Sequence, residues 1–98
     1  MNSYIINYLL TGMKGGRNRI DILQLLMKEK LNANQIKEKL GLDYKTVQHH
    51  LRLLLKNRLI SNSGKSYGAS YSWTDEFKLN IKLFNEILAK VNKSKHGR

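Results

Sequence analysis

The sequence of this 98-residue chain lacks cysteine, proline and any long apolar run. Without cysteine, it has no disulfide, no thiolate metal site and no cysteine nucleophile. Without proline, its helices and turns must end at glycines and polar caps. The longest apolar start, residues 4–10, is far shorter than the ~20 residues that a membrane-spanning helix needs. No basic segment precedes this stretch and no cleavage site follows it, so we predict no signal peptide and an intracellular protein.

Acidic residues are scarce, and they are unevenly distributed. Seven Asp and Glu stand against 18 Lys and Arg, a formal net charge of +11, which predicts attraction to a polyanion. Residues 44–74 contain no acid at all, whereas the remaining segments mix both signs. An anionic membrane would require a basic helix with an apolar face free to insert. The basic helix predicted over residues 43–57 needs its apolar face for the core, so we predict no membrane partner.

The histidines, acids and glycines form no pattern typical of a catalytic or metal site. His49 and His50 are adjacent, about 100° apart around a helix, and cannot readily hold one ion together. The seven acids include no pair suited to general acid–base catalysis. Gly12, Gly15 and Gly16 do not make a phosphate-binding loop. We therefore predict no metal site, no cofactor and no enzymatic activity.

Residues 43–57 are the most informative part of the chain. Asp43 can cap a helix on which Val47, Leu51 and Leu54 share one face. Another face carries side chains that can donate hydrogen bonds to phosphates or base edges. Upstream, residues 34–40 predict a short helix, opened by an Asn32–Gln35 capping box and ended by Gly41. Helix, glycine-containing turn and polar-faced helix are the organisation of a helix-turn-helix DNA reader.

The segment after this helix predicts a β-hairpin wing over residues 59–74. Residues 59–61 and 69–74 are strand candidates, and Tyr71 and Trp73 alternate with polar residues as in a half-buried strand. Between them lies a polar, glycine-rich turn. Lys65 and Tyr67 would lie near its tip and reach DNA, although an ordinary surface turn remains an alternative for Tyr67. The residues that we predict to contact DNA are Tyr44, Lys45, Thr46, Gln48, His49, Arg52, Lys56, Arg58, Lys65 and Tyr67.

The two ends of the chain predict further helices. Residues 3–13 favour a short helix, and residues 17–30 a helix buried on one broad face. After Thr74, a good N-cap, apolar residues recur at 4-3-4-3 spacing beside a second stripe of Leu79, Leu83 and Ile87. One stripe can contact the core and the other a second copy of the chain. The predicted dimer interface consists of Phe77, Ile81, Phe84, Leu88 and Val91.

We therefore predict one domain, mainly α with a small β-hairpin. Residues 1–16 form an N-terminal helix and loop, and residues 17–74 a winged helix-turn-helix. Residues 75–92 form a dimerisation helix, and residues 93–98 a frayed basic tail.

The region 32–60 resembles the helix-turn-helix of the arsenic-repressor-like (ArsR-like) winged-helix transcription regulators, especially the small archaeal ones. The residues that carry this resemblance are Leu40-Gly41-Leu42, Val47, His49 to Leu51, Leu54 and Leu59-Ile60, with Gly64 and Tyr71 in the wing. It covers about two thirds of the chain. It implies a homodimer joined through terminal helices that presents two reading helices to neighbouring major grooves. Family members that sense metals use cysteines, which are absent here, so metal sensing is not implied.

These observations predict a homodimeric, sequence-specific DNA-binding transcription regulator, a repressor that acts in the cytoplasm at the nucleoid. Two alternatives remain: a nonspecific architectural, chromatin-like DNA-binding protein, and a winged-helix module that binds an acidic protein. Thr46, Gln48 and His49 favour specific reading, because binding to phosphates alone requires only Lys and Arg. The acid-free stretch disfavours the protein-interaction alternative.

Overall fold

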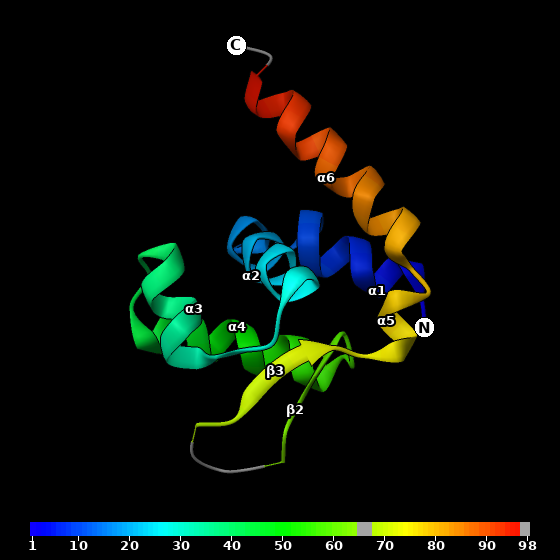
Figure 1. Cartoon of the computed structure of the whole chain (residues 1–98). Helices are drawn as coiled ribbons and strands as arrows, with labels where there is room; N and C mark the ends of the chain where they lie inside the picture. The colour runs from blue at the N-terminus through cyan, green and yellow to red at the C-terminus, as the bar shows by residue number, and fades with distance from the viewer. Residues whose placement is uncertain (65–67, 97–98) are drawn as a thin grey trace.

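The computed structural model describes residues 1–64 and 68–96, with side chains as far as residue 93. Its elements are, in chain order, α1 (Ser3–Asn7), the π-helix η1 (Tyr8–Gly12), α2 (Gly16–Lys28), β1 (Leu31–Asn32), α3 (Ala33–Leu40), α4 (Tyr44–Lys56), β2 (Ile60–Asn62), β3 (Ser70–Trp73), α5 (Asp75–Lys78) and α6 (Ile81–His96). Figure 1 shows α6 projecting from a body made by the other helices and the sheet. The predicted winged helix-turn-helix, mainly helical with a small sheet, is confirmed.

The two helices of the helix-turn-helix begin at the caps that the sequence predicts. The Asn32 side chain accepts from the Gln35 backbone N–H at 2.8 Å, and the Gln35 side chain accepts from the Asn32 N–H at 2.9 Å. Gly41 ends α3 with a φ of 66°, in the left-handed region where glycine is favoured. The Asp43 carboxylate then accepts from the Thr46 N–H at 3.0 Å and opens α4. Local capping chemistry therefore determines where α3 begins and ends and where α4 begins.

The predicted hairpin is part of a three-stranded antiparallel sheet of order β1-β3-β2. Ile60 of β2 pairs with Trp73 of β3, and both are buried. The third strand, β1, was not predicted, because two residues are too short to show an alternating pattern. Leu31 pairs with Tyr71, so β1 anchors the segment between α2 and α3 to the wing.

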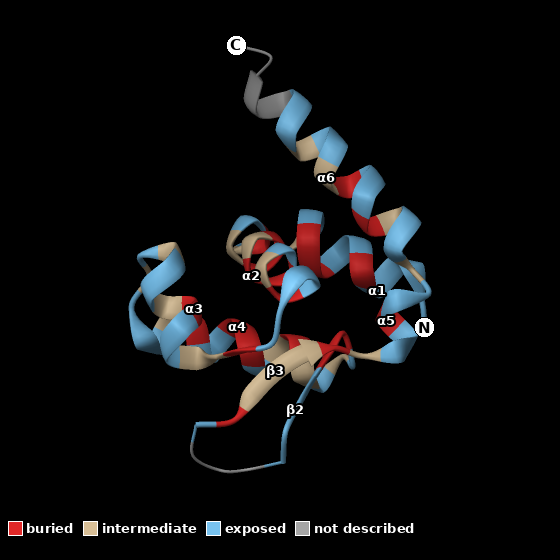
Figure 2. Cartoon of the chain, in the orientation of Figure 1, coloured by how far each residue is buried: buried red, intermediate tan, exposed pale blue. Residues whose placement is uncertain are grey.

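An aromatic cluster joins the wing to the C-terminal helices. The ring centroids of Trp73 lie 4.3 Å from Phe77 and 5.1 Å from Phe84. The Trp73 indole N–H donates to the Leu23 carbonyl at 2.8 Å, so its one polar group is satisfied inside the core. Figure 2 shows the buried residues gathered where the helices of the body face one another and the sheet.

The C-terminal segment 75–92 is not one helix, and this corrects the prediction. Helix α5 ends at Lys78, and α6 begins at Ile81 and runs to His96, past the predicted end at residue 92. The Asn80 carbonyl accepts from the Phe84 N–H at 3.0 Å and starts the new helix. The ring centroids of Phe77, on α5, and Phe84, on α6, lie 5.9 Å apart, and both rings pack on Trp73.

Two of the five predicted dimer-interface residues belong to the core of the protomer itself. Phe77 and Phe84 have 0% of their surface exposed, so they cannot touch a second copy. Ile81 is 38% exposed, and Leu88 and Val91 are half-buried. The apolar spacing predicted a buried face correctly but did not distinguish core from partner surface.

Candidate nucleic-acid interface

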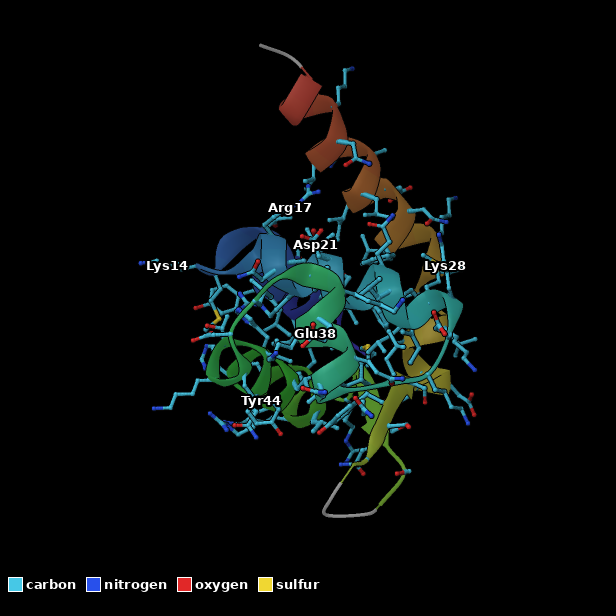
Figure 3. The ribbon with its side chains drawn as sticks, turned by 60° about the vertical axis from the view of Figure 1, so that its left-hand side comes forward. Lys14, Arg17, Asp21, Lys28, Glu38 and Tyr44 are labelled. Atoms are coloured by element: carbon cyan, nitrogen blue, oxygen red, sulfur yellow. The ribbon has the colours of Figure 1, made fainter. Side chains whose placement is uncertain are left out.

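The outward face of α4 brings together most of the residues that the sequence predicts to contact DNA. Tyr44, Lys45, Gln48 and His49 are exposed in its first half. Arg52 and Lys56 continue this exposed face toward its C-terminus, and Thr46 is half-buried at its edge. We call the set of Tyr44, Lys45, Thr46, Gln48, His49, Arg52 and Lys56 the outward face of α4. In Figure 3, Tyr44 lies toward the end of the molecule opposite to the tip of α6.

The cations of this face are available to a ligand. The ion pairs within the described part of the chain are Arg17–Asp21, Lys37–Glu38 and Lys78–Asp75, all outside α4. The nearest acid in sequence, Asp43, is engaged as the N-cap. Hydrogen bonding from Thr46 holds the pKa of the Asp43 carboxyl below its usual value, so the carboxylate stays charged at the positive end of the helix dipole.

Arg58, at the start of the wing, has an unusual backbone. Its φ is 64°, and it is the one residue other than glycine with a positive φ among those that the structure describes. The Thr74 hydroxyl donates to the Arg58 carbonyl at 2.7 Å and ties this turn to the N-cap of α5. Glycine would occupy this conformation without strain. The strained backbone at an exposed arginine is therefore consistent with a function of the Arg58 side chain itself, such as the predicted contact with DNA.

Two predicted DNA contacts, Lys65 and Tyr67, lie outside the described residues. The strands that lead to them, β2 and β3, extend below α4 in Figure 1. The described residues contain no group of three histidines and acids that could hold a metal ion, and no helix among them has the length and hydropathy to cross a bilayer.

The inward face of α4 contains a contact that the sequence analysis missed. Arg19 of α2 is 0% exposed and His50 of α4 is 4% exposed. The Arg19 side chain donates to the carbonyls of Leu9, Met13 and Lys14 at 2.7, 3.2 and 2.9 Å. Its Nη1 lies 3.0 Å from the His50 Nδ1. Arg19 therefore links the end of the N-terminal helical segment to the reading helix.

This contact sets the protonation of His50. A guanidinium can only donate, so the His50 Nδ1 accepts and the neutral ring has its proton on Nε2. Burial, and then the charges of Arg19 and His49, lower the pKa of His50 to about 4. Gly15 makes room for the pair, because a Cβ there would lie 2.8 Å from the His50 Cε1. The signal in the sequence was an arginine within the apolar stripe of α2, three residues after the Gly15–Gly16 pair.

The buried histidine predicts a pH-dependent stability. In the folded chain His50 stays neutral down to about pH 4, whereas in the unfolded chain it takes up a proton near its ordinary pKa of 6.5. Unfolding is therefore favoured as the pH falls from 6.5 to 4, and the full stability is present above 6.5. Urea unfolding should show a loss of about 1 kcal/mol between pH 6 and pH 5.

Adjacent histidines provide the control for this measurement. His49→Gln, at an exposed position, should keep the dependence, whereas His50→Gln should remove it between pH 5 and 6.5. Equal slopes in the two variants would assign the effect to other groups.

Comparisons with known proteins agree with this geometry. Residues 17–62 match the model of the bacterial regulatory protein arsR family. HlyU, a transcriptional regulator from Vibrio vulnificus, is 28% identical, with a TM-score of 0.64 over 88% of this chain and 90% of that chain. The homodimeric winged helix-turn-helix DNA-binding domain of Mb0332 from Mycobacterium bovis is 16% identical, with a TM-score of 0.67 over 98% and 82%. No curated protein matches the chain significantly.

A further solved structure contains nucleic acid. The Zalpha domain of PKZ from Carassius auratus, in complex with Z-DNA, is 25% identical, with a TM-score of 0.55 over 59% of this chain and 94% of that chain. The fold of residues around the outward face of α4 is thus shared with proteins described as DNA-binding.

Proposed function

We propose that this chain, whose residues 17–62 match the model of the arsR family of bacterial regulatory proteins, is a homodimeric, sequence-specific DNA-binding regulator of transcription that represses by blocking access to promoters. The observation that carries this proposal is the outward face of α4. It combines unpaired cations with side chains able to read bases, on an element held rigidly by its buried face. We expect it to act in the cytoplasm, at the nucleoid.

The arrangement suits entry of α4 into the major groove. In helix-turn-helix proteins the N-terminal part of the second helix contacts base edges. Gln48 and His49 lie in that part of α4, and Arg52 lies one turn further along. Gln can pair with the N6/N7 edge of adenine, and Arg with the O6/N7 edge of guanine. Lys45, Lys56 and Arg58 flank them and are suited to the phosphates.

Gln48→Ala distinguishes a sequence reader from an architectural protein, the alternative that the net charge of +11 favours. A preferred site would first be selected from a random duplex pool. The substitution should then weaken binding to that site by about 1–3 kcal/mol for each half-site, roughly 5- to 150-fold per protomer of the dimer, because each protomer loses a bidentate base contact. Binding to random duplex should hardly change.

The preferred site should be palindromic, with half-sites centred about 10–10.5 bp or a multiple of it apart. Equal weakening on both duplexes, or selection without a preferred site, would favour the architectural protein. Lys39→Ala, at an exposed lysine of α3, is the control for general loss of charge.

The terminal helices provide the surface for a dimer. Tyr4, Ile5 and Tyr8 expose 82%, 39% and 57% of their surface on α1 and η1. Helix α6 projects from the body and has Leu88 and Val91 half-buried on its distal half (Figures 1 and 2). Exposed apolar side chains such as those of α1 and η1 are typical of an interface. We therefore propose that α1 and the distal half of α6 contact a second copy.

The chain should sediment at equilibrium with twice its own mass at micromolar concentration. The double substitution Tyr4→Asp/Tyr8→Asp should give a folded monomer, because both side chains are exposed in the protomer and two buried charges would oppose association. Asn85→Asp, at an exposed position of α6, is the control and should leave the dimer intact. A wild-type monomer, with and without DNA, would contradict the proposed dimer.

A further inference from the structure

A pocket of about 450 Å³ lies between the end of α2, strand β3 and the junction of α5 with α6. Four apolar side chains line it: Leu26, Met27, Trp73 and Ile81. Trp73 and Leu26 are buried, whereas Met27 and Ile81 are 37% and 38% exposed. The volume is in the range of pockets that hold small molecules, about 300–1,000 Å³. The pocket therefore offers an apolar space with access from solvent.

Lysines dominate the charges of this pocket. Lys28, Lys30 and Lys78 line it, against one acid, Glu29. Lys78 lies 3.7 Å from Asp75, in an exposed ion pair that solvent weakens. Figure 3 shows Lys28 on the side of the molecule where α6 begins. The lysines also compensate the negative end of the α2 dipole, which would otherwise oppose an anion.

We propose that this pocket binds a small organic carboxylate with an apolar body. The apolar lining would take up the body, and Lys28 and Lys30 would hold the carboxylate near the surface. Such a ligand would contact the winged helix and α6 at once, because both line the pocket. The proposal rests on this lining alone and does not depend on the proposed DNA-binding function.

The probe is octanoate, compared with 1-octanol and octylammonium, which have the same chain length. Trp73 is the single tryptophan of the chain, so its fluorescence reports on the pocket. Titration of the full chain should give a saturable fluorescence change with octanoate. Octanol should bind about tenfold more weakly, and octylammonium should give no saturable change, because only the carboxylate gains from the lysines.

Variants test the lysines directly. Lys28→Gln/Lys30→Gln should weaken octanoate binding about tenfold and leave octanol binding unchanged. Lys82→Gln/Lys90→Gln removes two exposed lysines of α6 that do not line the pocket, and it should leave octanoate binding unchanged.

Three results would overturn the proposal. They are the absence of a saturable change with octanoate, equal affinity for octanol, and an octanoate affinity that falls as the protein concentration rises. The last would show that a second copy of the chain covers the pocket.

Discussion

Raising the salt concentration from 50 to 200 mM should weaken binding to duplex DNA by about 10³- to 10⁵-fold. The physical reason is the release of condensed counterions, one for nearly every phosphate that the protein neutralises. The proposed phosphate contacts are Lys45, Lys56, Arg58 and Lys65 in each protomer, and twice four gives about eight in a dimer. Fluorescence anisotropy with a labelled duplex measures the slope of log K against log salt. An affinity that is independent of salt would exclude this mode of binding.

Arg58 separates this effect from stability. Arg58→Gly should reduce the salt slope by about two units, one from each protomer of a dimer. It should keep the fold, or stabilise it by about 1 kcal/mol, because glycine adopts the positive φ of 64° without strain. The control is Lys82→Ala on α6, which removes a lysine outside the proposed DNA contacts and should leave the salt slope unchanged. A destabilised Arg58→Gly protein would contradict the structural reason given for the residue.

Gly16→Ala should cause the largest loss of stability of any glycine substitution in the described chain. A Cβ at Gly16 would lie 2.3 Å from the carbonyl oxygen of Leu10 and 2.8 Å from its carbon, so η1 and α2 would have to separate. Because both atoms belong to the backbone, no side chain can rotate to make room. We expect a loss of about 3 kcal/mol in the free energy of unfolding and a fall of about 12 °C or more in Tm.

Two other glycines serve as matched controls. At Gly12 a Cβ would meet only the side chain of Tyr8, at 3.3 Å, so Gly12→Ala should be nearly neutral. Gly41 has open space but a φ of 66°, so Gly41→Ala should cost about 1 kcal/mol from backbone strain alone. Urea unfolding of the three variants gives the ranking, and a Gly16→Ala protein as stable as Gly12→Ala would contradict the tight packing of η1 on α2.

The helix-turn-helix could be predicted from sequence because its signals are local. The Asn32–Gln35 box and the Asp43 cap each involve hydrogen bonds between residues three apart. The same holds for Thr74, which accepts from the Phe77 N–H. The outward face of α4 follows from helical spacing once its start is known. The residues of this face that we predicted to contact DNA are exposed or half-buried in the structure. Their contacts with DNA remain proposals.

The remaining features depend on residues that are distant in the chain. Arg19 contacts residues ten and thirty-one positions away, which no short pattern reveals. The break before α6 depends on the packing of Phe77 and Phe84 against Trp73, a strand residue. Local sequence contained one clue there, since Asn80 is a good residue to start a helix. The apolar periodicity of residues 75–92 favoured one continuous helix, but the packing of the two phenylalanines on Trp73 accompanies a break between α5 and α6.

The contacts of Arg19 also bear on where the functional unit begins. The family match starts at residue 17, but a fragment that started there would lack the carbonyls of Leu9, Met13 and Lys14. The Arg19 guanidinium, which is buried in the whole chain, would then keep one partner, His50. Water would have to replace the three lost carbonyls. The DNA-reading motif is therefore not a portable module in this protein. Transplanting it into a chimaera would require the first sixteen residues as well, because they complete its interior.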